Sequence, residues 1–133
     1  MATIAAGNDL IQQADALDAA ADAVSPRTSD AHIPFEDRKK IFAQSQELRS
    51  QALQLRTMAG IAVTRELSVE VAIVQAAIDD AKKVLSTVNR VQDLIDVATS
   101  LAKLGMAITV GPPVAVPGAL TSLKADVDRV KTA

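Results

Sequence analysis

The chain has 133 residues, of which 49% are hydrophobic and 23% charged, and its net charge is −2. These values are ordinary for a globular domain and argue against wholesale disorder. The chain has no Cys, which excludes a disulfide scaffold and any zinc site built on Cys. The charge balance lacks a dominant basic patch and there are only two aromatic residues, so nucleic-acid binding is disfavoured.

The composition predicts an all-α protein with a single helical domain over residues 1–133. Alanine, the best helix former, dominates the chain, whereas the aromatic residues that enrich strands are nearly absent. Gly and Pro number five each and cluster in two places, which leaves long stretches unbroken. Strand-rich folds would need more frequent turns.

The first helix is expected over residues 5–24. Its apolar residues recur at alternating spacings of four and three, which places them in one seam: Leu10, Ala14, Leu17, Ala21 and Val24. Pro26 ends this helix because proline disfavours helical geometry at the residue before it. Residues 25–33 form a polar loop, and Pro34 opens the second helix, since proline is tolerated at a first helical position.

The second helix continues to about Leu67, and Ser68 is the expected N-cap of the third. The second seam is Ile41, Ser45, Leu48, Ala52, Leu55, Ala59 and Ala62. The third helix runs to near Gly105 along Val74, Ile78, Ala81, Leu85, Val88, Val91, Ile95, Ala98 and Ala102. After a breaker segment at 107–116, a short final helix starts at Pro117 with a seam of Val116, Leu120, Leu123, Val127 and Val130.

These lengths predict an elongated antiparallel bundle of about four helices with coiled-coil spacing. A third helix of about 38 residues would be roughly 57 Å long, whereas a compact chain of this size has a radius of gyration of about 14 Å. The two long helices therefore form a central hairpin flanked by the two shorter ones. At its tip, residues 58–74, only two helices meet.

The tip is apolar on all sides, and a helix of that kind must be covered by something. We expect a second copy of the chain, or another helical protein, to cover it through Met58, Ile61, Val63, Val69, Val71 and Ile73. The alternative is that the third helix breaks near residues 87–89 and folds back over the tip within one chain.

No motif indicates catalysis, so the chain is not expected to be an enzyme or to bind a cofactor or metal. Asp15, Asp18 and Asp22 share one flank of the first helix, where they are interpreted as a solvated face or as partners of the more basic second helix. His32 is the only histidine and is interpreted as a loop residue. The basic run 38–40 is interpreted as a solvated face, with contact to an anionic lipid or phosphate as the alternative.

Residues 104–123 form an uncharged run of 20 residues. A run of this length would suit a membrane span. Three prolines and three glycines within the run argue instead for a buried connection, with an interfacial hairpin as the alternative. The leading hypothesis is a non-enzymatic interaction or structural protein that self-associates, and the second is a lipid-surface protein. Because Met1–Leu10 lacks the features of a secretory signal, a cytoplasmic location is expected, and export without a cleaved signal stays an alternative.

Overall fold

The computed structural model describes residues 4–61 and 65–132. Within them the chain folds into five α-helices: α1 (Asn8–Val24), α2 (Phe35–Gly60), α3 (Val71–Thr87), α4 (Val91–Thr109) and α5 (Ala115–Thr132). A 3₁₀ turn, η1 (Ser25–Ser29), follows α1. Two strands of two residues each, β1 (Ile4–Ala5) and β2 (Arg65–Glu66), pair antiparallel and tie the N-terminal segment to the connection between α2 and α3. The expected all-α class is confirmed.

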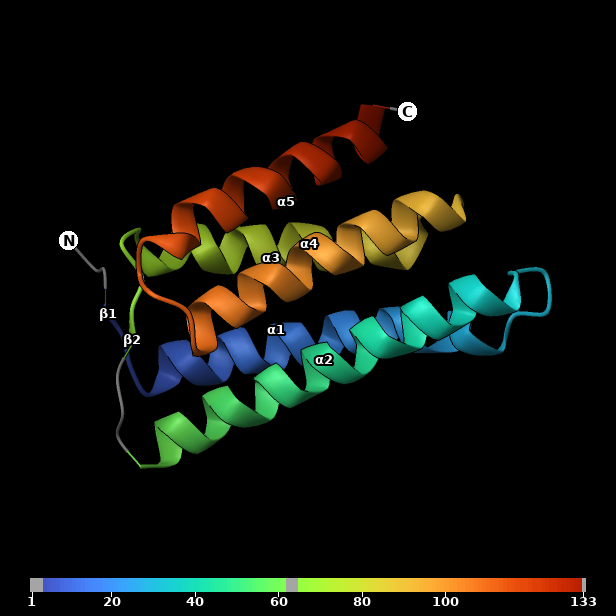
Figure 1. The fold of residues 1–133 in the computed structure, drawn as a ribbon. Helices are drawn as coiled ribbons and strands as arrows, with labels where there is room; N and C mark the ends of the chain where they lie inside the picture. Colours follow the sequence, from blue (N-terminus) through green and yellow to red (C-terminus); the bar gives the residue numbers. More distant parts are fainter. Residues whose placement is uncertain (1–3, 62–64, 133) are drawn as a thin grey trace.

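The helices stack in three levels, with α1 and α2 in the lowest, α3 and α4 in the middle and α5 on top (Figure 1). Helix α1 packs against α2 and α3, and α4 packs against α2, α3 and α5. Successive helices run in alternating directions, so that α2 and α4 are parallel neighbours. This arrangement replaces the expected bundle of four helices around one long hairpin.

The predicted seams contribute most of their residues to the core, although Ala59 of the second seam is only half-buried and Ala62 lies outside the described residues. All five seam residues of α1 are fully buried, and so are Ile41, Leu48, Ala52 and Leu55 of α2. In α5, four of the five seam residues are buried and Val130 is half-buried against the core. Helix α5 begins two residues before the predicted start at Pro117.

The expectation of one long third helix is wrong. It is two helices, because Val88 and Arg90 adopt extended conformations, with ψ angles of 137° and 126°. The Arg27 Nη2 donates a hydrogen bond of 2.6 Å to the carbonyl oxygen of Val88 and so holds the break against η1. The alternative of a break near residues 87–89 is therefore right about the break, although the folded-back helix packs between α2 and α5 and leaves Ile61 and Ile73 of the tip exposed.

The break is favourable because α4 is apolar on more than one face. Besides Ile95 and Ala98 of the predicted seam, α4 buries a second set of side chains: Leu94, Val97, Leu101, Leu104 and Ile108. A straight helix continuing from α3 would have exposed this second set. Folding back inserts α4 between α2 and α5, where both sets are covered.

Helix boundaries near glycine also differ from prediction. Helix α2 ends at Gly60 instead of continuing to about Leu67, and Ser68 has a positive φ of 60° instead of capping a helix. Helix α4 continues through Gly105 to Thr109. Gly105 is buried against the side chain of Gln51, which a Cβ at this position would overlap. The glycine thus permits the close approach of α4 to α2.

The predicted tip is partly sheltered by its own chain. Val71 is buried, and Met58 and Val69 pack half-buried against the core. Ile61 and Ile73 remain 68% and 42% exposed. Val63 lies outside the described residues. The argument that one chain cannot cover this region is therefore wrong for Val71, whereas the side chains of the two isoleucines are exposed in the single chain.

Candidate interaction surface

Charged residues are unevenly distributed along the bundle. One end, on the left in Figure 1, is formed by the starts of α1, α3 and α5, the ends of α2 and α4, and their connections. We call residues 4–14, 50–61, 65–78 and 104–123 the charge-poor end. They contain five of the 14 basic and 16 acidic residues of the chain, and the other 25 belong to the remaining segments.

The same end carries most of the exposed apolar side chains. Of the ten large hydrophobic residues that the described structure leaves exposed, only Phe35 and Phe42 lie outside it. The eight at the charge-poor end are Ile4, Ile11, Leu53, Ile61, Ile73, Met106, Val110 and Val114. A clustering of exposed apolar side chains with few charges among them is typical of an interaction surface.

A groove between the ends of α2 and α4 connects several of these residues. Leu53, Thr57 and Met58 form one wall, and Thr109 and Val110 form the other, around a volume of about 310 Å³. Leu53 and Val110 are 66% and 64% exposed. The groove exists because α2 and α4 run in parallel and reach the charge-poor end together (Figure 1).

A second groove of about 500 Å³ lies between α4 and α5. Among the described residues its lining contains one charged residue, Lys103, and otherwise consists of small, apolar and hydroxyl-bearing residues: Met106, Ala107, Gly111, Pro112, Ala115, Gly118, Ala119 and Ser122. Met106 lies one helical turn before Val110, so the two grooves border the same exposed edge of α4.

The structure divides the predicted interface residues. Ile61 and Ile73 are exposed at the charge-poor end, Met58 lines the α2–α4 groove, and Val69 is half-buried. Val71 is in the core. The main residues that sequence reasoning missed are Leu53, Met106, Val110 and Val114. Two features of the sequence could have identified them. Each is an apolar residue outside the predicted seams, and each lies within the uncharged run 104–123 or, like Leu53, packs beside it.

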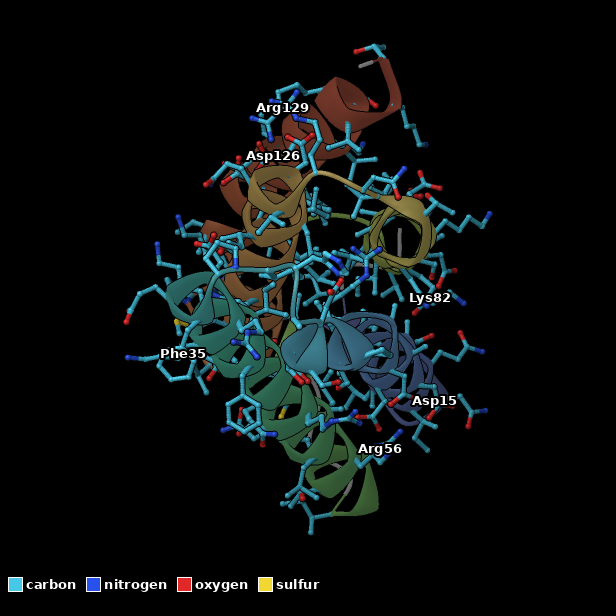
Figure 2. All side chains as sticks on the ribbon, turned by 90° about the vertical axis from the view of Figure 1, so that its right-hand side faces the viewer. Asp15, Phe35, Arg56, Lys82, Asp126 and Arg129 are labelled. Atoms are coloured by element: carbon cyan, nitrogen blue, oxygen red, sulfur yellow. The ribbon has the colours of Figure 1, made fainter. Side chains whose placement is uncertain are left out.

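The acidic flank of α1 meets α2, as one of the two sequence interpretations held. Arg56 pairs with Asp15 at 2.7 Å and with Asp18, and Arg49 pairs with Asp22 at 2.9 Å. Figure 2 shows Asp15 beside Arg56. The hydrogen bonds to Asp15 and Asp18 raise the pKa of the Arg56 guanidinium. Each of these three aspartates therefore forms an ion pair with an arginine of α2.

A similar network joins α4 to α5 away from the charge-poor end. Arg129 contacts Asp96 at 3.1 Å, Asp126 at 3.6 Å and Asp93 at 3.7 Å. Ser100 donates a hydrogen bond to the carboxylate of Asp126, which lies beside Arg129 (Figure 2). Each of these pairs is at least partly exposed, so each contributes at most about 1 kcal/mol.

His32 lies in the loop before α2, where its side chain is 99% exposed. The backbone N–H of His32 donates a hydrogen bond to Asp30, and this bond lowers the pKa of the Asp30 carboxyl. Across residues 4–61 and 65–132, no three His, Cys, Asp or Glu side chains gather as they would around a metal ion.

In the described part of the chain, none of the helices combines the length and apolar character needed to cross a bilayer. Comparisons with protein families, with curated proteins and with solved structures gave no match to this chain.

Proposed function

We propose that this chain is a non-enzymatic helical interaction protein that self-associates through its charge-poor end. The observation that supports this most is the coincidence of few charges and eight exposed large hydrophobic side chains at one end of the bundle. The grooves beside α4 add concave apolar surface to it. Burial of such surface is the main favourable contribution to protein association.

A second copy suits this surface better than a charged partner. In a two-fold symmetric dimer each residue near the axis meets its own copy, so that any charge there would meet a like charge. The charge-poor end largely avoids this repulsion. Gln54, Thr57 and Ser122 line its grooves and provide hydrogen-bonding groups for a polar rim.

The test is the assembly state of the full chain, measured by sedimentation velocity from 1 to 100 µM. We expect the native chain to form a dimer and Ile61→Asp to remain monomeric, because a carboxylate in an apolar interface is left without a partner. Ile61 is 68% exposed, so the substitution should leave the fold and its circular dichroism unchanged.

Phe42→Asp is the matched control, because it places the same charge at an exposed apolar position outside the charge-poor end. This variant should still dimerise. A native chain that stays monomeric throughout the concentration range would refute the proposal. An Ile61→Asp variant that dimerises as well as the native chain would place the interface elsewhere.

The alternative is a lipid-surface protein, favoured by the exposure of Val110 and Val114 within the uncharged run. The charge-poor end has few cations, so such binding would depend on apolar insertion and would not require anionic lipid. Co-sedimentation with phosphatidylcholine vesicles tests this alternative. Binding that Val114→Asp abolishes would support it.

A further inference from the structure

The only two aromatic residues of the chain are both exposed, on one face of α2. Phe35 is 63% exposed and Phe42 is 54% exposed. Seven residues apart, they occupy nearly the same angular position on the helix. Phe35 projects away from the bundle (Figure 2). Phenylalanine is ordinarily among the most buried residues, so the stability of the fold does not explain this placement.

Both rings line one pocket at the start of α2, outside the charge-poor end. The pocket has a volume of about 440 Å³, and its lining includes Thr28, Phe35, Arg38, Lys39 and Phe42, which we call the aromatic–basic pocket. The Arg38 Cζ lies 5.7 Å from the centroid of the Phe35 ring, and the Lys39 Nζ lies 5.4 Å from it. Apolar and cationic groups are thus side by side.

The Arg38 guanidinium has no acidic partner among the described residues, whereas two of the nearby cations, Lys39 and Arg27, do have partners. Lys39 pairs with Glu36 at 3.6 Å, and Arg27 donates to the carbonyl oxygen of Val88. The Nε of Arg38 is buried and lacks a hydrogen-bond partner in the described part of the chain. Arg38 also lines the pocket, and a guanidinium presents a planar set of donors that matches a carboxylate.

We propose that the aromatic–basic pocket binds an acidic peptide segment of another protein. A carboxylate of the segment pairs with Arg38, and a neighbouring aliphatic side chain packs against the Phe35 and Phe42 rings. Phenylalanine and arginine are both enriched at protein interfaces relative to the rest of the surface. The site is separate from the charge-poor end, and the inference does not depend on self-association.

An anionic membrane fits this site less well than a peptide. Recognition of anionic lipid typically uses clusters of four to eight basic residues. Here the three consecutive basic residues at 38–40 directly follow Glu36 and Asp37, which leaves this stretch with a net charge of +1. The rings border a pocket, and a side chain of a peptide can enter it.

Nuclear magnetic resonance of the full chain can test the proposal directly. His32, Phe35 and Phe42 account for all aromatic proton signals, so the two rings are easily followed. The probe is an amidated synthetic peptide of alternating Asp and Leu, and its control has Asn in place of Asp. We expect the Asp–Leu peptide to shift the Phe ring and Arg38 Nε–H signals saturably, and the Asn–Leu peptide to bind at least about tenfold more weakly.

Two variants separate the contribution of the Arg38 guanidinium to peptide binding from general charge attraction. Arg38→Gln should weaken binding of the Asp–Leu peptide about tenfold, because it removes a charged hydrogen bond. Lys40→Gln removes the same charge from a residue outside the pocket and should change binding by less than about twofold in 150 mM salt, where exposed charges are screened. Unchanged amide spectra of both variants will show that the fold is intact.

Three results would overturn the proposal. The first is an Asp–Leu peptide that leaves the ring signals unshifted at 1 mM. The second is an equal loss of binding in Lys40→Gln and Arg38→Gln, which would indicate general charge attraction. The third is a ring shift caused by vesicles of two parts phosphatidylcholine and one part phosphatidylserine, but not by the peptide, which would identify a membrane site.

Discussion

A glutamine in the core of the bundle should reduce its stability. Gln13 of α1 is completely buried, with 0% of its surface exposed. Neither its amide nitrogen nor its amide oxygen has a hydrogen-bond partner among residues 4–61 and 65–132. In the unfolded chain both atoms would be hydrated, so folding leaves them without their hydrogen bonds to water. We predict that Gln13→Met stabilises the protein.

The change in stability caused by Gln13→Met can be estimated from the loss of the unpaired amide group alone. Methionine has a similar unbranched shape and nearly the same helix propensity as glutamine, so packing and helix formation should change little. A buried donor or acceptor without a partner costs about 1–3 kcal/mol. We therefore expect the free energy of unfolding to rise by about 1–3 kcal/mol. For a chain of this length each kcal/mol corresponds to about 4 °C in Tm.

Urea unfolding followed by circular dichroism at 222 nm measures this difference. All variants must be compared at one protein concentration, because self-association would make stability depend on concentration. Gln12→Met is the matched control, since Gln12 is exposed on the same helix and its replacement should change stability by less than about 0.5 kcal/mol. A Gln13→Met protein less stable than Gln12→Met would show that the amide of Gln13 is paired in the folded state.

Two other predictions concern close contacts between helices. Gly105→Ala should destabilise the protein by about 1–2 kcal/mol despite the better helix propensity of alanine, because the new Cβ would displace the buried Gln51 amide from its hydrogen bond to the Ala102 carbonyl. Gly118→Ala, in open space on α5, should stabilise it by about 0.5–1 kcal/mol. Both are measured by thermal unfolding, and equal effects would contradict the contact with Gln51. Arg27→Met removes the hydrogen bond to the Val88 carbonyl and should cost about 1.5 kcal/mol in urea unfolding. An unchanged midpoint would show that the break between α3 and α4 needs no such support.

The seams of α1, α2 and α5 could be predicted because each of these helices buries one stripe. Residues spaced four and three apart report that stripe directly, as Leu10, Leu17 and Val24 do in α1. The predicted end of the first helix at Val24 and the predicted start of the second at Pro34 agree with the structure to within one residue, since proline restricts the backbone locally. Local signals were enough wherever local chemistry determined the structure.

The break between α3 and α4 was harder to predict because its cause is tertiary. Residues 87–90 contain no proline or glycine, so propensity does not locate the break. The decisive feature is the second apolar set on α4, which includes Leu94 and Leu101 and is buried because α4 turns back between α2 and α5. A prediction that follows one apolar face of a continuous helix does not take into account that a second face of α4 must also be buried.

The candidate surface was only half visible in the sequence for a related reason. Ile61 and Ile73 were identified from the all-round apolar character of the tip, and both are exposed. Leu53 and Val110 come from segments 57 residues apart, and they line one groove only because α2 and α4 run in parallel. That adjacency depends on the break in the third predicted helix, which the leading interpretation lacked.

The two proposed surfaces share a property that the fold itself does not require. The core is complete without the exposed apolar residues, since every helix buries its own set of side chains. Phe35, Leu53 and Val110 therefore add little to folding while presenting apolar area to water, and polar residues at these positions would serve the monomer as well. Their charge environments differ. One surface carries few charges, and we propose a second copy as its partner. The other places beside two rings a guanidinium without an acidic partner among the described residues, and we propose an acidic partner for it. A self-associated chain would then present two aromatic–basic pockets, so that a partner with two acidic segments would bind the dimer more tightly than the monomer if its linker spanned both sites.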